Sequence, residues 1–150
     1  MSNPVTAAIQ DRWFAAVANN GWSDVAALIR QGASCAWTTV REQSALHLAI
    51  EHGHEPLATF LMGVHLAQGV ELDLENRQGH TPLGVAIDKH ASAVVQRLLE
   101  SGAAATRSVR FIGKAPANAW LAAAHVGATP ILRVLSTHAP EIIDTALGDG

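Results

Sequence analysis

The sequence contains a single cysteine, Cys35, so its 150 residues cannot form an intramolecular disulfide framework. Residues 1–6 have neither the basic region nor the apolar run of a secretory signal peptide. No apolar run reaches the length of about eighteen residues that a membrane-spanning helix needs. We therefore predict a cytoplasmic protein that does not contact a membrane.

Charge is also scarce, because only 15% of the residues are charged while 49% are hydrophobic. This composition indicates one folded domain and not a disordered chain. The net charge of −3 excludes the strongly basic domain that general nucleic-acid binding requires. The charges are unevenly spread, since residues 42–76 hold six acids and no Lys or Arg, whereas residues 101–140 hold four cations and no acid. Such polarity can steer a charged partner.

Catalytic motifs are missing as well. The sequence has no nucleophile elbow, Walker loop or dinucleotide-binding fingerprint. Asp73 and Glu75 lie in a connection and are expected to face solvent, and Cys35 is expected to be partly buried. Ser44 lies one helical turn before His47, but it is better interpreted as a helix N-cap. We predict that the chain is not an enzyme and uses no cofactor.

A patterned stretch over residues 79–103 organises the chain. Thr81-Pro82-Leu83 predicts a helix start, because Pro at the first helical position loses no needed N–H and Thr caps the free donors. Val94, Val95, Leu98 and Leu99 follow at helical spacing, and Gly102 can adopt the left-handed conformation that ends a helix. This stretch closely resembles the ankyrin repeat.

The pattern recurs at a constant spacing. Boxes like Thr-Pro-Leu-His begin at Ser44, Thr81 and Asn118, which are 37 residues apart, against 33 in the ankyrin family. The four extra residues fall in 63–68, as an extended helix end or loop, and in 106–116, where residues 107–114 match no expected element. The resemblance therefore implies an all-α ankyrin repeat solenoid of about four helix-turn-helix repeats with degenerate terminal caps. The single domain, residues 1–150, divides into repeats over approximately 5–37, 41–70, 76–103 and 114–139, with a C-terminal tail over 140–150.

The first repeat lacks a Thr-Pro start, which suits a terminal cap. We expect its helices near residues 6–19 and 23–31, with Ser23 as N-cap and Gly32 as the stop of the second helix. Trp13, Trp22 and Trp120 are expected to complete the core.

The histidines raise the alternative of a metal site, since His47, His52 and His54 are closely spaced and His65 is near. The resemblance implies structural roles instead. His47 matches the box histidine that hydrogen-bonds between neighbouring repeats, and His54 matches the Gly-His position that ends a first helix. Zinc sites also favour cysteines or a tighter ligand set. We predict no metal ligands.

The resemblance further implies a binding surface on the concave face, made by the turn tips and the exposed face of each first helix. Ala18 and Asn19 fall on this face in the first repeat. The predicted partner-binding residues are Trp37, Arg41, Glu42, Glu51, His52, Arg77, Gln78, His80, Asp88, Lys89, Arg107, Arg110, Phe111 and His125.

The leading hypothesis is a non-enzymatic module that binds another protein, as a monomer or with weak self-association. Because no catalytic domain is attached, an inhibitor, an immunity-type protein or an adaptor is more natural than a targeting domain. If the partner is a toxin or enzyme, the acidic middle of the chain would face a basic cleft. The alternatives are a metal- or ligand-sensing protein that uses the His47, His52 and His54 region, and a self-associating structural repeat protein.

Overall fold

The computed structural model describes residues 4–105, 109–112, 115–138 and 140, and this part contains eight helices in four consecutive pairs. The pairs are α1 (Pro4–Ala18) with α2 (Trp22–Arg30), α3 (Ala45–Glu51) with α4 (Glu55–Gln68), α5 (Pro82–Asp88) with α6 (Ser92–Glu100), and α7 (Ala119–Val126) with α8 (Thr129–His138).

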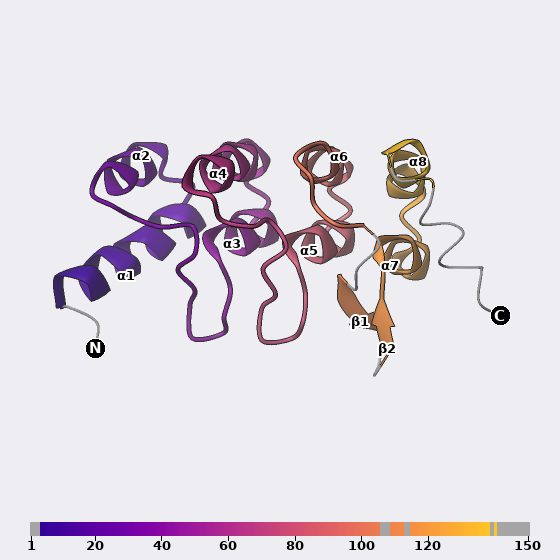
Figure 1. Cartoon of the computed structure of the whole chain (residues 1–150), viewed down its shortest axis with the longest axis horizontal. Coiled ribbons are helices and arrows are strands. Elements are labelled where there is room, and N and C mark those ends of the chain that lie inside the picture. Colours follow the sequence, from indigo (N-terminus) through magenta and orange to yellow (C-terminus); the bar gives the residue numbers. More distant parts are fainter. Residues whose placement is uncertain (1–3, 106–108, 113–114, 139, 141–150) are drawn as a thin grey trace.

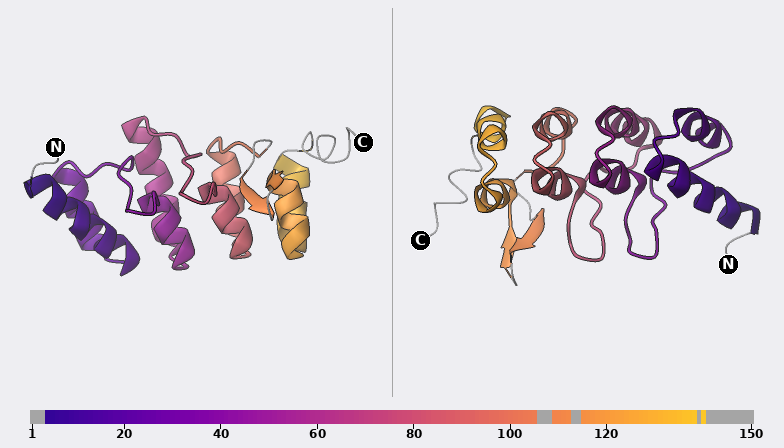
Figure 2. Two further views of the ribbon diagram at one scale, coloured as in Figure 1. Left: turned by 90° about the horizontal axis from the view of Figure 1, so that it is seen from below. Right: turned by 180° about the vertical axis from the view of Figure 1, so that it is seen from behind.

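The helices form two layers (Figure 1). The inner layer contains α1, α3, α5 and α7, each in contact with the next, and each of these helices packs on the outer helix that follows it. Figure 2 shows from two further sides that the pairs stand in one row, with α1 and α8 at opposite ends. The predicted all-α solenoid is confirmed. None of the helices in the described ranges is both long and apolar enough to cross a membrane.

The three boxes start the inner helices as the register predicts. The backbone N–H of His47, Gly84 and Leu121 donates to the side chain of Ser44, Thr81 and Asn118, respectively, and this satisfies donors that have no partner within the helix. At the far end of the repeat, Gly32 and Gly102 take the predicted left-handed conformation, with φ of +97° and +100°.

The predicted N-cap Ser23 is wrong. Helix α2 begins one residue earlier, at Trp22, and its N-cap position is Gly21, which provides no side-chain hydrogen bond. A backbone hydrogen bond instead fixes the turn before α2, since the Gly21 N–H donates to the Ala16 carbonyl at 2.8 Å. Ser23 therefore lies inside the first turn.

The first insertion is an extended helix end. Helix α4 has 14 residues, whereas α2 and α6 have 9 each. The added turn brings Gln68 back to the preceding repeat, where its Oε1 accepts from the Cys35 N–H at 2.9 Å and its Nε2 donates to the Ala33 carbonyl at 3.0 Å. The insertion thus joins the first two repeats.

The second insertion forms a β-hairpin, which the sequence pattern did not predict. Strand β1 (Arg110–Ile112) pairs antiparallel with β2 (Ala115–Ala117). At its base the Val109 carbonyl accepts from the Thr81 N–H at 2.9 Å, and the Val109 N–H donates to the Ala117 carbonyl at 2.8 Å. The hairpin is therefore tied to the start of α5.

The core runs along the interface between the two layers. Trp13 is fully buried as predicted, and Trp120 packs against the core while half-buried. The prediction for Trp22 is wrong, because 42% of this residue is exposed and its ring lies 5.5 Å from that of Phe60 on α4. Cys35 is completely buried and not partly buried as expected, which raises the pKa of its thiol to about 12. A thiol with so high a pKa is a poor nucleophile.

Replacing Leu98 with Ala should lower the free energy of unfolding by about 2–5 kcal/mol, because this fully buried side chain would leave a cavity in the core. Urea unfolding followed by circular dichroism measures the change. The exposed neighbour Gln96, replaced with Ala, is the control and should change stability by less than about 0.5 kcal/mol. A loss below about 1 kcal/mol for Leu98→Ala would contradict the core position.

Candidate inner groove between the fingers and the inner helices

Two finger-like connections project from the inner layer (Figure 1). We name residues 36–43 the first finger and residues 73–80 the second finger. Thr39 Oγ1 accepts from the backbone N–H of Arg41 and Gln43 at 3.2 and 3.3 Å. Asn76, 37 positions later, places its Oδ1 in the same way, 2.9 and 3.0 Å from the N–H of Gln78 and His80. The two fingers therefore share one turn shape.

The fingers also agree in backbone conformation and bind each other. Each carries a residue in the left-handed region two positions before its box, with φ of +60° at Glu42 and +78° at Gly79. Glycine takes this conformation without cost, whereas a residue with a Cβ does not. The Arg77 N–H donates to the Arg41 carbonyl at 3.0 Å, which fixes the two fingers side by side.

His47 connects α3 to the second finger. Its Nδ1 lies 3.2 Å from the backbone nitrogen of Ser44, an obligate donor, so Nδ1 accepts and Nε2 carries the proton. Nε2 then donates to the His80 carbonyl at 2.8 Å. The predicted hydrogen bond between neighbouring repeats is confirmed. Since the ring is fully buried, desolvation lowers its pKa to about 4.

Further bonds join the repeats. His54 Nε2 lies 2.9 Å from the Ala18 carbonyl, which confirms a structural role for this histidine. The Asp73 carboxylate accepts from the Ala104 N–H at 3.1 and 3.3 Å, so the expectation that Asp73 faces solvent is wrong. Its short side chain reaches the next connection because the repeats stack closely.

A groove runs between the fingers and the inner helices, and we name it the inner groove. It contains two adjoining hollows of about 520 and 380 Å³, which share Gln43, Glu51, Asn76 and Gln78. The first hollow is also lined by Arg41 and Arg77, and the second by His80, Val85, Asp88 and Lys89. Only Val85 among these is apolar, so the groove is a polar surface that spans two repeats.

The family follows from this geometry and from the sequence together. Residues 13–108 match the family model described as ankyrin repeats, three copies. The chain belongs to the ankyrin repeat family. Ankyrin repeats generally mediate protein–protein interaction, and they are typically not enzymes. The pair of α7 and α8 lies beyond the matched range and continues the ankyrin stack.

Half of the predicted partner-binding residues meet in the inner groove of this ankyrin stack. They come from both fingers and from the C-terminal ends of α3 and α5, and they are Arg41, Glu51, Arg77, Gln78, His80, Asp88 and Lys89. Glu51 is held in place by the Gln43 Nε2, which donates to its carboxylate at 2.7 Å.

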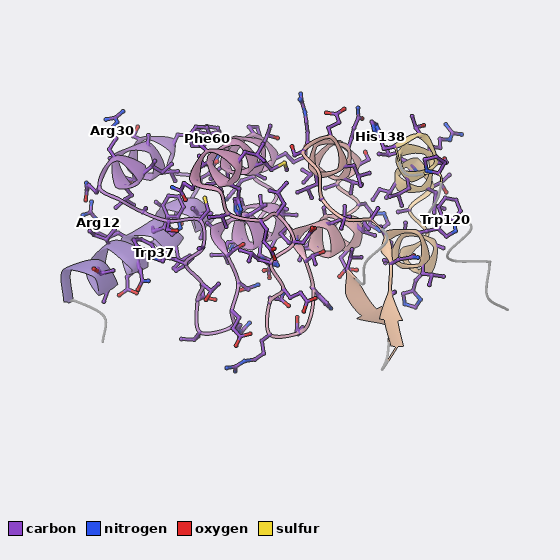
Figure 3. The ribbon with its side chains drawn as sticks, in the orientation of Figure 1. Arg12, Arg30, Trp37, Phe60, Trp120 and His138 are labelled. Atoms are coloured by element: carbon purple, nitrogen blue, oxygen red, sulfur yellow. The ribbon has the colours of Figure 1, made fainter. Side chains whose placement is uncertain are left out.

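The other predicted residues do not line the groove. Trp37 is half-buried and packs against the core at the base of the first finger (Figure 3). Glu42, His52 and His125 are exposed but line neither hollow. Asn19 lies in a separate hollow with Arg12 and Asp24, and Ala18 is half-buried outside all three. Arg107 lies outside the described residues, and of Arg110 and Phe111 only the backbone in β1 is described.

Three lining residues were missed, and the register could have found one of them. Gln43 immediately precedes the box at Ser44, as His80 precedes the box at Thr81. The register that predicts His80 as a binding residue therefore also indicates Gln43. The sequence does not indicate Asn76, because its buried side chain forms the turn of the finger. It does not indicate Val85 either, because an apolar residue on an inner helix is expected to belong to the core.

The histidine region does not have the geometry of a metal centre. Both ring nitrogens of His47 already bind protein atoms, and the rings of His52 and His54 stack with centroids 5.9 Å apart. Across the residues that the structure describes, no three His, Cys, Asp or Glu side chains gather as metal ligands.

Stability should fall with acidity because of His47. Its folded-state pKa of about 4 lies below the ordinary 6.5, so the unfolded chain takes up the proton first as pH falls. The contribution of neutral His47 to the free energy of unfolding is complete above about pH 6.5. It should decrease by about 3 kcal/mol as the pH falls to about 4. Burial also lowers the pKa of His65, which adds in the same direction.

Urea unfolding across this pH range measures the effect in the intact chain, in His47→Asn and in the exposed-residue control His52→Asn. The control should keep the steep pH dependence, and His47→Asn should flatten it even though that variant starts less stable. Parallel curves for all three proteins would contradict the assignment to His47.

Proposed function

We propose that the protein is a non-enzymatic module that binds another protein in the inner groove and acts as an inhibitor, an immunity-type protein or an adaptor. The observation that carries this proposal is the convergence of side chains from two fingers and two inner helices on one continuous groove. A surface built from equivalent positions of successive repeats suits a segment that lies along the stack.

The character of the groove favours a protein over a small molecule. Small-molecule sites are mostly apolar, enclosed hollows that surround their ligand. Here, long polar and charged side chains such as Arg77, Gln78 and Lys89 are exposed, and the two hollows adjoin along the row of repeats. Arginine, which lines the first hollow twice, is enriched at protein interfaces.

Ser44 and His47 have the spacing of a catalytic Ser–His pair but another role. Ser44 Oγ lies 2.8 Å from His47 Nδ1, the distance of a nucleophile and its base. Both residues are fully buried, however, and the remaining nitrogen of His47 is bound to the His80 carbonyl. A substrate cannot reach this hydroxyl, which supports a role as helix cap and favours the binding function.

The test fills the groove and leaves the fold unchanged. The exposed side chain of Gln78 lines both hollows, so Gln78→Trp should obstruct them and reduce capture of the partner by about tenfold or more. Gln96→Trp is the matched control, because it places the same indole on the exposed outer face of α6. Capture from an extract of the native cells, quantified by mass spectrometry for the three proteins side by side, provides the measurement.

A single protein that is captured by the intact chain and by Gln96→Trp, but not by Gln78→Trp, is the expected outcome. Thermal unfolding of each variant establishes that the fold is retained. Equal capture of a stoichiometric partner by all three proteins would place the binding surface outside the inner groove and overturn the proposal.

A further inference from the structure

The two fingers present a pair of exposed arginines to the same hollow. Arg41 and Arg77 both line the larger hollow, and the hydrogen bond between their backbones holds them on adjacent fingers. In the described portion of the chain, neither guanidinium takes part in an ion pair or a hydrogen bond. Two neighbouring cations without a partner are an uncommon arrangement, since like charges repel at short distance.

The acidic residues of the groove compensate only part of its positive charge. Glu51 lines the same hollow, and its carboxylate stays charged because the group that donates to it at 2.7 Å is the neutral Gln43 amide. The charged side chains that line the two hollows are three cations and two acids, so the lining carries a net positive charge. In the larger hollow, the two guanidinium groups, with five N–H donors each, are therefore the largest set of donors available to a partner.

We infer that the segment of the partner that enters the inner groove is acidic, and that its Asp or Glu carboxylates bind Arg41 and Arg77. A guanidinium donates two parallel N–H bonds to a carboxylate, which gives both affinity and orientation. The inference rests on the proposed function and names the chemistry of its partner. It departs from the expectation that the acidic middle of this chain meets a basic cleft, because the charged side chains that line the two hollows are cationic on balance.

Selection from a phage-displayed library of random peptides tests the inference without knowledge of the partner. Peptides selected on the intact chain should be enriched in Asp and Glu. The affinity of a selected peptide, measured by fluorescence polarisation, should fall by about tenfold or more for the double variant Arg41→Ala with Arg77→Ala. Replacing the acids of the peptide with Asn and Gln should cause a similar loss.

Two further variants separate geometry from charge. Arg41→Lys with Arg77→Lys keeps the charge and removes the planar fork, so it should recover only part of the affinity. Arg30→Ala removes an exposed arginine from the outer layer, on the side away from the fingers (Figure 3), and should leave the affinity unchanged.

The outcomes distinguish this inference from the proposed function. Selected peptides that are basic or uncharged, yet lose binding to Gln78→Trp, would overturn the inference and leave the groove function intact. Acidic peptides that bind the double alanine variant as well as the intact chain would also overturn it. A selection in which no peptide depends on the groove would overturn both.

Discussion

The hydrogen bond from His47 to the His80 carbonyl is the interaction on which both the stack and the groove depend. A solenoid holds together only through contacts between adjacent repeats. The His47 ring completes the cap of α3 through Ser44 and, on its other side, holds the second finger, whose turn is closed by the Asn76 N–H on the same carbonyl. The position of Arg77 and Gln78 over the groove therefore depends on a buried, uncharged imidazole.

The interface between the third and fourth repeats is held by different hydrogen bonds. Gly84 occupies the position equivalent to His47 in the following repeat, so no imidazole is available there. The backbone of Thr81 binds Val109 instead, and Asp73 binds the Ala104 N–H. Because these bonds come from connections and not from helices, the strength of coupling between repeats depends on loop residues as much as on the helical pattern.

The sequence predicts the features that repeat and fails where a feature occurs once. Caps at Ser44 and Thr81, helix ends at Gly32 and Gly102, and seven groove residues follow from a register that recurs. The paired strands β1 and β2 were missed because they have three residues each, too few for a recognisable period. Trp22 was misplaced because the sequence does not specify how much of its ring the neighbouring outer helix covers, and here Phe60 covers only part of it.

The Gln68 side chain gives the insertion in α4 a particular meaning. Its amide accepts one backbone hydrogen bond and donates another to residues two apart in the connection of the preceding repeat, Cys35 and Ala33. A residue of a neighbouring parallel β-strand makes the same pair of bonds with its own N–H and C=O, so the side chain imitates one step of a parallel sheet ladder. The extra helical turn is consequently not neutral variation in length. A chain shortened to the family's usual spacing would have to find a different partner for both backbone groups, or leave them to water.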